Sequence, residues 1–246
     1  MALSIGRNPI MERLKAGKPV DRLYVVEGEK HGSILKLLGK AKAMGVPIFT
    51  VPAEKLDEMA EGGKHQGVVA IVTDFSYQTV DEILERAERA GKKPKLVILD
   101  GLEDPHNLGA IIRTAECAGF HGIIIPERRS VSVTDTVIRT SAGAVEYMPV
   151  ARVVNISDTI DYLKDKGLWI YCADMGGEST PYDVDLTGAL ALVVGGEGKG
   201  VGKKVREHCD VVVSLPMFGQ INSLNASNAA AILIYESVRQ EQKSHG

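Results

Sequence analysis

Three segments in the back half of the chain combine glycines with amide, hydroxyl and guanidinium side chains, which can bind and position a substrate. The first reads LDGLEDPHNLGAIIRTAECAGF from residue 99. We expect Asn107 to cap a helix here, with Arg113 one to two turns further along it. Arginine stays protonated and presents five fixed donors, which suit a phosphate group. The alternative interpretation is an ordinary helix cap and a surface arginine.

The second segment is a glycine loop, LVVGGEGKGVG, that begins at residue 192. Its five glycines allow positive φ angles and a close approach of the backbone to a ligand. They are Gly195, Gly196, Gly198, Gly200 and Gly202. The spacing fits neither the phosphate-binding loop G-x-x-x-x-G-K-S/T nor the dinucleotide pattern G-x-G-x-x-G. Only one clear strand follows the loop, which disfavours a Rossmann-type cofactor site and favours another kind of ligand-contacting turn.

The third segment, LPMFGQINSLNAS from residue 215, joins a strand to the last helix. Ser223 or Asn225 is expected to cap that helix. Their hydroxyl and amide groups, placed beside the glycine loop, would form a neutral pocket that suits a cationic sulfonium; capping alone is the alternative. No G-x-S-x-G or H-E-x-x-H pattern occurs, and three isolated cysteines contain no C-x-x-C pair. Hydrolase, zinc and disulfide chemistries are therefore disfavoured, and we expect no metal.

The elements that would position these segments alternate between strand and helix. Expected strands are LVILD, GIIIP, VEYMPV, LWIYCAD, ALVVGGEG and DVVVSLP, with helices from about residue 107 and over 135–142, 156–166 and 224–240. Short continuous apolar strands separated by helices predict a mostly parallel sheet covered on both faces. On the last helix, the expected apolar stripe contains Leu224, Ala231, Ile232, Tyr235 and Val238.

The front of the chain is predicted to form a separate, smaller α/β domain over residues 1–75, with strands at 23–28, 46–51 and 67–74 and helices at 31–44 and 52–61. Residues 76–95 are expected to be a linker with one helix, and 96–246 the second domain. Residues 1–50 carry nine Lys and Arg against four Asp and Glu, although the whole chain has a net charge of −3. The basic residues that could form a phosphate-facing surface, or simply solvate helices, are Lys15, Lys18, Arg22, Lys30, His31, Lys36, Lys40 and Lys42.

Nothing in the sequence predicts export or insertion into a membrane. No apolar run approaches the roughly 20 residues of a membrane helix, and the opening MALSIGRNPIMERLK lacks the apolar core of a signal peptide. We therefore expect a cytoplasmic protein.

Taken together, three motifs resemble the signature motifs of the SpoU (TrmH-like) RNA methyltransferases of the SPOUT superfamily. They are N-L-G-x-I-x-R-T at 107–114, GGEGKG at 195–200 and LPM-x-G-x-x-x-SLNAS at 215–227. The resemblance implies a parallel-sheet fold with a C-terminal trefoil knot, which the general rules of chain connection treat as a rare exception. The front domain resembles the L30e-like RNA-binding domain of the rRNA members. The resemblance also implies a homodimer, S-adenosyl-L-methionine as cofactor, and RNA rather than DNA as partner.

Roles carry over by position in the motifs. Arg113 matches the family's catalytic arginine, Asn107 its partner and Glu197 the acid of the second motif, while Ser223 and Asn225 match polar active-site residues. Residues matching the cofactor-binding positions are Gly195, Gly196, Leu215, Met217 and Leu224. The implied reaction is attack of a ribose 2'-hydroxyl on the sulfonium methyl group. Arginine is a poor general base because its pKa exceeds about 12, so Arg113 is expected to act electrostatically or together with the substrate phosphate.

Within the family, the GRNPI opening, the DPHNLGA stretch and the REHCD turn most resemble the type that methylates a guanosine in the peptidyl-transferase loop of 23S rRNA. Relatives with the same motifs methylate transfer RNA or another rRNA position. A different class of function is a non-catalytic RNA-binding factor for ribosome assembly. The intact motif residues argue against it, and cofactor binding distinguishes the two.

Overall fold

The computed structural model describes residues 2–28, 32–72, 75–198 and 200–244. The chain divides into two compact units, Met1–Ser76 with Glu127–Thr136, and Tyr77–Pro126 with Val137–Gly246. Each unit has its own sheet and its own hydrophobic core. The expectation of a small α/β domain in front of a parallel-sheet domain is confirmed.

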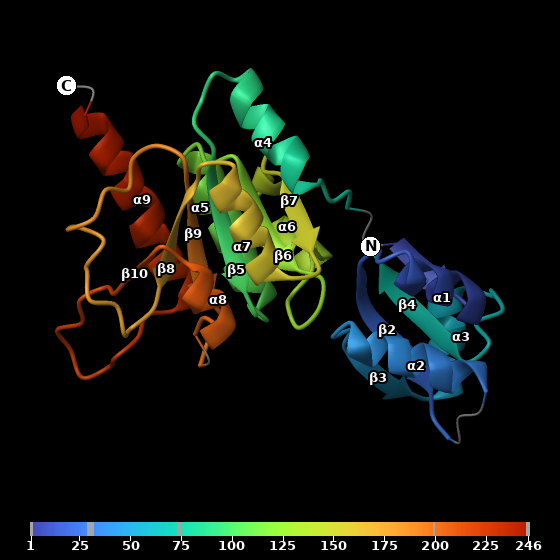
Figure 1. Ribbon diagram of the computed structural model, residues 1–246. Helices are drawn as coiled ribbons and strands as arrows, with labels where there is room; N and C mark the ends of the chain where they lie inside the picture. The colour runs from blue at the N-terminus through green and yellow to red at the C-terminus, as the bar shows by residue number, and fades with distance from the viewer. Residues whose placement is uncertain (1, 29–31, 73–74, 199, 245–246) are drawn as a thin grey trace. The chain divides into compact units, whose positions relative to one another are not determined.

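The first unit is a four-stranded mixed sheet with helices on both faces (Figure 1). Its strands lie in the order β1-β4-β2-β3, with only β2 and β3 parallel. The strands are β1 (Ala2–Ile5), β2 (Val20–Val26), β3 (Ile48–Val51) and β4 (Val68–Val72), and the helices α1 (Arg7–Lys15), α2 (Ser33–Ala43) and α3 (Ala53–Ala60). Alternation along β4 supplies two cores: Val68 and Ala70 pack with α1 and α2, whereas Val69 packs with α3.

Two elements of this unit, β1 and α1, were not expected from the sequence. Of the basic residues predicted to face RNA, Lys40 is half-buried and Lys15, Lys18, Arg22, Lys36 and Lys42 are exposed. Lys15 forms an ion pair of 2.8 Å with Glu12. Lys30 and His31 lie outside the described residues. Phosphate contact by this set stays a prediction.

The second unit is a six-stranded, fully parallel sheet in the order β10-β8-β9-β5-β6-β7. Its strands are β5 (Lys95–Asp100), β6 (Gly122–Pro126), β7 (Val150–Val153), β8 (Trp169–Ala173), β9 (Leu190–Gly195) and β10 (Val211–Val213). Its longer helices are α4 (Val80–Arg89), α5 (Pro105–Cys117), α7 (Ile156–Asp165) and α9 (Ala226–Ser244), and its short ones α6 (Asp135–Thr140) and α8 (Lys203–His208).

Both faces of this sheet are buried, as the continuous apolar strands predicted. On one face, Leu96 and Ile98 pack in a cluster with Ile83 of α4, Ile160 of α7 and Val205 of α8. The alternate residues of the strands point to the opposite face, where α5 and α9 contact each other. Helix α4, expected within the linker, thus belongs to the second core.

The strand expected at VEYMPV is wrong. Ala144–Glu146 form a 3-10 turn, and strand β7 starts only after Pro149. The pattern misled because Val145 and Met148 are three residues apart and both buried, as on one face of a tight helical turn, whereas Tyr147 is exposed. The chain reaches this turn through Ala142 and Gly143, which both have positive φ.

The expected apolar stripe of α9 is also wrong. Ile232 and Tyr235 are 37% and 50% exposed, whereas Ala230, Leu233 and Ile234 are buried. The helix therefore packs against the sheet with the face that carries Ala230, Leu233 and Ile234, which is adjacent to the face that hydropathy alone predicts. This leaves large apolar side chains on its outer surface.

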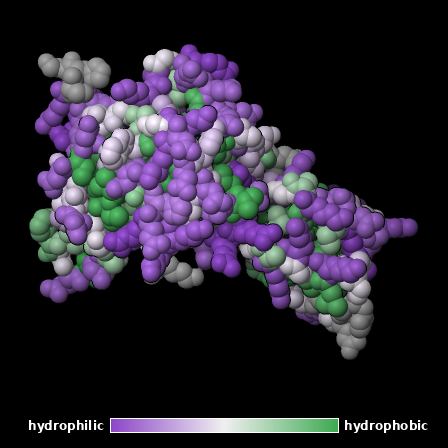
Figure 2. All heavy atoms as spheres, in the orientation of Figure 1, coloured by the Kyte–Doolittle hydropathy of each residue, from purple (hydrophilic) through white to green (hydrophobic). Residues whose placement is uncertain are grey.

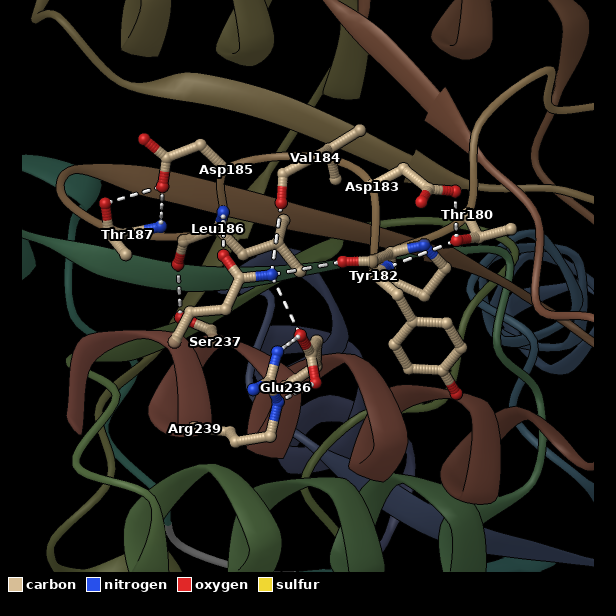
Figure 3. Close-up of polar contacts among 12 residues, drawn as sticks. Thr180, Tyr182, Asp183, Val184, Asp185, Leu186, Thr187, Glu236, Ser237 and Arg239 are labelled. Atoms are coloured by element: carbon tan, nitrogen blue, oxygen red, sulfur yellow. Dashed lines mark hydrogen bonds and ion pairs between the residues drawn. The ribbon is translucent and has the colours of Figure 1, made fainter. Parts of the chain in front are cut away.

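Polar contacts hold the connection between β8 and β9 on α9 (Figure 3). Gln240 donates from Nε2 to the carbonyls of Pro181 (3.2 Å) and Val184 (3.1 Å), and its Oε1 accepts from the Leu186 N–H (2.8 Å). Ser237 Oγ donates to the Leu186 carbonyl at 2.7 Å. One helix face thus satisfies several backbone groups of a segment without regular structure.

The order of strands puts a topological switch between β5 and β9. From β5 the chain proceeds through β6 and β7 to one edge, whereas β9, β8 and β10 lie on the other side. Ligands of open parallel sheets bind beyond the carboxyl ends of the strands at such a switch. The trefoil knot is not tested by the strand order and stays a prediction.

Across the described ranges, no helix is long and apolar enough to span a membrane. The face seen in Figure 2 is mostly hydrophilic, with scattered apolar patches. Among the same residues, no group of three or more His, Cys, Asp and Glu side chains is placed to hold a metal ion.

Candidate active site

The loop after β9 folds back onto the end of β5. Asp100 and Gly195 are register partners at the ends of these strands, and the Gly196 N–H donates to the Asp100 carbonyl at 2.9 Å. The Asp100 side chain accepts from the Gly202 N–H at 2.8 Å. Asp100 was not singled out from the sequence, although an acid directly after a buried strand was the available signal.

The first two glycines of this loop are explained by packing within the protein. A Cβ on Gly195 would lie 2.1 Å from the carbonyl carbon of Gly200, and one on Gly196 would lie 2.2 Å from the Gly101 oxygen. Gly198 and Gly200 have positive φ of 78° and 63°, which turn the chain back. The backbone that closely approaches these glycines is therefore the chain's own; Lys199 lies outside the described residues.

Helix α5 begins two residues earlier than expected. Asp104 is its N-cap, accepting from the His106 N–H at 2.8 Å, and Pro105 occupies the first turn, where it needs no hydrogen-bond partner for its nitrogen. The prediction that Asn107 caps this helix is therefore wrong. Asn107 lies inside the first turn, 4% exposed, and its side chain is free to serve another group.

That group is Glu197 of the glycine loop. Asn107 Nδ2 donates to Glu197 Oε1, and Asn225 Nδ2 donates to the same oxygen at 3.1 Å. Three segments separated by 90 and 28 residues thus meet at one carboxylate oxygen. Asn225 also accepts from the Ser227 N–H at 2.9 Å and so caps α9. Asn225 therefore caps α9 and contacts Glu197 at the same time, so the two roles that the sequence left as alternatives do not exclude each other.

Arg113 does not join this cluster. It lies six residues beyond Asn107, about 9 Å along the helix axis and about 120° around it. Its side chain is exposed, and no hydrogen bond or ion pair to another described residue is observed. Ser223 is likewise exposed. Of the predicted cofactor positions outside the glycine loop, Leu215 is half-buried, while Met217 and Leu224 are 37% and 41% exposed.

The end of β8 contributes one ion pair to the same edge of the sheet. Asp174 directly follows β8 and pairs with Arg206 of α8 at 3.1 Å, and Arg206 also donates to the Gly176 carbonyl at 3.0 Å. This pair was not expected from the sequence. Its two members lie 32 residues apart, so that no local pattern relates them.

Two parts of the chain match known protein families. Residues 94–235 match the SpoU rRNA Methylase family, and residues 4–78 match the domain described as RNA 2'-O ribose methyltransferase substrate binding. The chain belongs to the SpoU family of RNA methyltransferases. The second unit of this SpoU protein therefore carries the methylase domain, and the cluster at Glu197 lies within it.

Two of the similar proteins match the SpoU chain over nearly its full length, and a third matches two thirds of it. YacO of Bacillus subtilis, named as a putative TrmH family tRNA/rRNA methyltransferase, is 44% identical over 235 residues, which cover 96% of this chain and 94% of YacO. Among solved structures, the SpoU methyltransferase AviRb from Streptomyces viridochromogenes, in complex with AdoMet, aligns with a TM-score of 0.63 and 28% identity over 98% of this chain and 90% of AviRb. The A. aeolicus TrmH/SpoU tRNA modifying enzyme aligns with a TM-score of 0.58 and 26% identity, over 67% of this chain and 86% of its own.

Proposed function

We propose that this protein transfers a methyl group from S-adenosyl-L-methionine to a ribose 2'-hydroxyl of RNA, at a guanosine in the peptidyl-transferase loop of 23S rRNA. The observation that carries the proposal is the convergence of Asn107 and Asn225 on Glu197, because it joins all three motifs at the switch point of the sheet. A protein that modifies RNA in this way would act in the cytoplasm.

The residues at this edge fit the proposed cofactor. Gly195, Gly196, Leu215, Met217 and Leu224 would hold it through backbone groups, and the carboxylate of Glu197 with its neutral amide neighbours suits a positively charged sulfonium. The cofactor, when bound, supplies an electrophilic methyl group. AviRb, solved with AdoMet, supports this assignment.

The protein's own part in the reaction is mainly to position groups. Alignment of two reactants within one site can account for much of a rate enhancement. Asn107 and Asn225 hold the Glu197 carboxylate in place, and Ser223 would contact the substrate. The Arg113 guanidinium would bind the phosphate beside the reacting ribose and stabilise the charge that develops as the 2'-hydroxyl loses its proton. Replacing Arg113 with alanine should therefore abolish methyl transfer and leave cofactor affinity largely unchanged; an equal loss of both would contradict this role.

We further propose that two copies form a homodimer whose active sites each combine residues of both. Arg113 lies away from Glu197 in its own chain, so that a second copy is the source of the guanidinium for each site. Ile221, Ile232 and Tyr235 are 75%, 37% and 50% exposed, and large apolar side chains on the surface mark interfaces. The second copy would cover them.

Mixing two inactive variants tests the shared site. In a dimer of one Arg113→Ala chain and one Glu197→Ala chain, a shared arrangement leaves one site with both changes and the other with none. Random mixing makes about half of the dimers mixed, so activity should return to about a quarter of wild type. If Arg113 serves its own chain, every site carries one defect and no activity returns. A monomer by light scattering would also refute the dimer.

The RNA target is tested by mapping ribose methylation on total rRNA and tRNA from cells with and without the gene. Loss of a single guanosine methyl from 23S rRNA is the expected result. Loss from transfer RNA would keep the chemistry and replace the substrate, as the name of the A. aeolicus relative suggests. No loss, together with no binding of S-adenosyl-L-methionine in vitro, would favour the assembly-factor alternative.

A further inference from the structure

A second candidate site lies at the opposite edge of the six-stranded sheet, where the strands begin. A cleft is lined there by Lys92 and Lys93 before β5, Lys95 at its start, and His121 just before β6. Gly188, before β9, and Glu241 of α9 are among the other residues that line it. A strand of six residues spans about 20 Å, so this cleft is remote from the Glu197 cluster and independent of the proposed methyl transfer.

The cleft carries an excess of positive charge. Lys95 is 5% exposed, and its Nζ lies 2.6 Å from Glu241 Oε1 and 2.9 Å from Ser237 Oγ, so its charge is compensated. Lys92 and Lys93 are exposed and form no ion pair with any acid among the described residues. Lys93 interacts electrostatically with Asp185, whose pKa it helps to lower, but neither lysine is held in an ion pair by a described acid, so both ammonium groups can turn toward an anion in the cleft.

His121 lies near the same positive charges. Its Nδ1 accepts the Lys95 N–H at 3.1 Å, which assigns the proton of the neutral ring to Nε2. Nε2 is buried without a hydrogen-bond partner among the described protein atoms. Burial, followed by the charges of Lys92, Lys95 and Arg86, lowers the pKa of His121. Because Nε2 is buried, a ligand in the cleft would contact the neutral ring rather than this donor, and the ring adds no positive charge to the cleft.

An aromatic side chain lies in the same row of the sheet. Lys95 and Trp169 are both register partners of Leu190, so the three point to the same face, and Trp169 lies about 10 Å from Lys95 across two strand spacings. Trp169 is 59% exposed and is the only tryptophan of the chain. Exposed aromatic rings beside basic grooves stack with nucleobases.

We propose that this cleft binds the phosphate group of a free nucleotide or of an RNA chain, and that a base of the same ligand reaches Trp169, which lies outside the lining of the cleft. Lysines act as point charges toward phosphate and need no fixed geometry, which fits the two exposed lysines. Because Lys95 is paired with Glu241, recognition of the phosphate is left to Lys92 and Lys93.

The test uses the full-length protein and two probes, inorganic pyrophosphate by calorimetry and a single-stranded RNA of about ten nucleotides by quenching of Trp169 emission. The double variant Lys92→Ala/Lys93→Ala should weaken binding by about fivefold or more. The matched control is Lys203→Ala/Lys204→Ala, which removes two adjacent exposed lysines of α8. It should leave pyrophosphate affinity unchanged.

Each outcome has a definite meaning. Pyrophosphate binding that depends on the cleft lysines supports the proposal with a free phosphate compound as ligand. Quenching by RNA alone, lost in the cleft variant, supports it with RNA as the source of the phosphate. The proposal is overturned if neither probe binds, if binding survives in the cleft variant, or if pyrophosphate affinity falls equally in the control. None of these readouts depends on methyl transfer.

Discussion

Removal of the Glu197 carboxylate should destabilise the protein as well as inactivate it. Asn107 and Asn225 both donate to Glu197 Oε1, but only Asn107 is buried, at 4% exposure. In Glu197→Ala, water can replace the carboxylate at exposed Asn225, whereas Nδ2 of Asn107 is left without an acceptor inside the protein.

The magnitude follows from this asymmetry. A buried polar group that loses its partner costs about 1–3 kcal/mol, whereas an exposed one costs little. Glu197→Ala should therefore lower the free energy of unfolding by about 2 kcal/mol. Glu197→Gln keeps an acceptor oxygen at the same place and should cost less than about 1 kcal/mol.

Urea unfolding measures these differences. The control is Glu207→Ala, which removes an exposed acid 3.8 Å from Lys203 and should change stability by less than about 0.5 kcal/mol. The double variant Asn107→Leu/Glu197→Ala removes donor and acceptor together, so it should be less destabilised than the sum of the single changes by about 1 kcal/mol. A Glu197→Ala protein as stable as Glu207→Ala, or strictly additive effects, would refute the role given to this hydrogen bond.

Three further changes test other parts of the second unit. Gln240→Ala deprives three backbone groups of partners and should lower the free energy of unfolding by about 2–3 kcal/mol. The control Gln242→Ala, on the exposed surface of the same helix, should change it little. Equal urea midpoints for the two variants would contradict this. Gly109→Ala places a Cβ 2.6 Å from Cβ of Thr140 and should cost about 1–3 kcal/mol by overpacking, seen as a lower melting temperature. The folded protein lowers the pKa of His121 below its ordinary 6.5, so the contribution of His121 to stability is present above about pH 6.5 and is lost as pH falls through the folded pKa. The loss of stability below about pH 6.5 should therefore be smaller in His121→Gln. An unchanged dependence of stability on pH in this variant would exclude His121 as the source of the loss.

Most elements of the fold could be predicted from local patterns. The strand GIIIP has the predicted bounds, because its three consecutive isoleucines are flanked by Gly122 and Pro126, which limit the strand at both ends. The predictions were wrong where tertiary contacts determine which face of a helix is buried. Tyr235 looked like a core residue in the helical pattern, yet α9 buries Leu233 and Ile234 instead, since the position of the sheet, rather than hydropathy, decides which side of a helix is covered.

The residue types of the site followed from the motifs, but its contacts did not. The motifs name Asn107, Glu197 and Asn225 as separate positions, with helix capping as the alternative role of the two asparagines. Their meeting at one oxygen depends on β9 lying beside β5, an adjacency of strands about ninety residues apart. Arg113, the most suggestive residue of the first motif, lies away from them because a helix turns about 100° per residue.

The family follows from three motifs whose residues and order are specific, and the alternation of strand and helix follows from hydropathy and glycine placement, which act locally. The strand order, the close packing that requires Gly195 and Gly196, and the lysine cleft at the far edge of the sheet are properties of the folded chain. Each of these depends on segments distant along the chain, and no local pattern encodes which of them become neighbours once the shared core is buried.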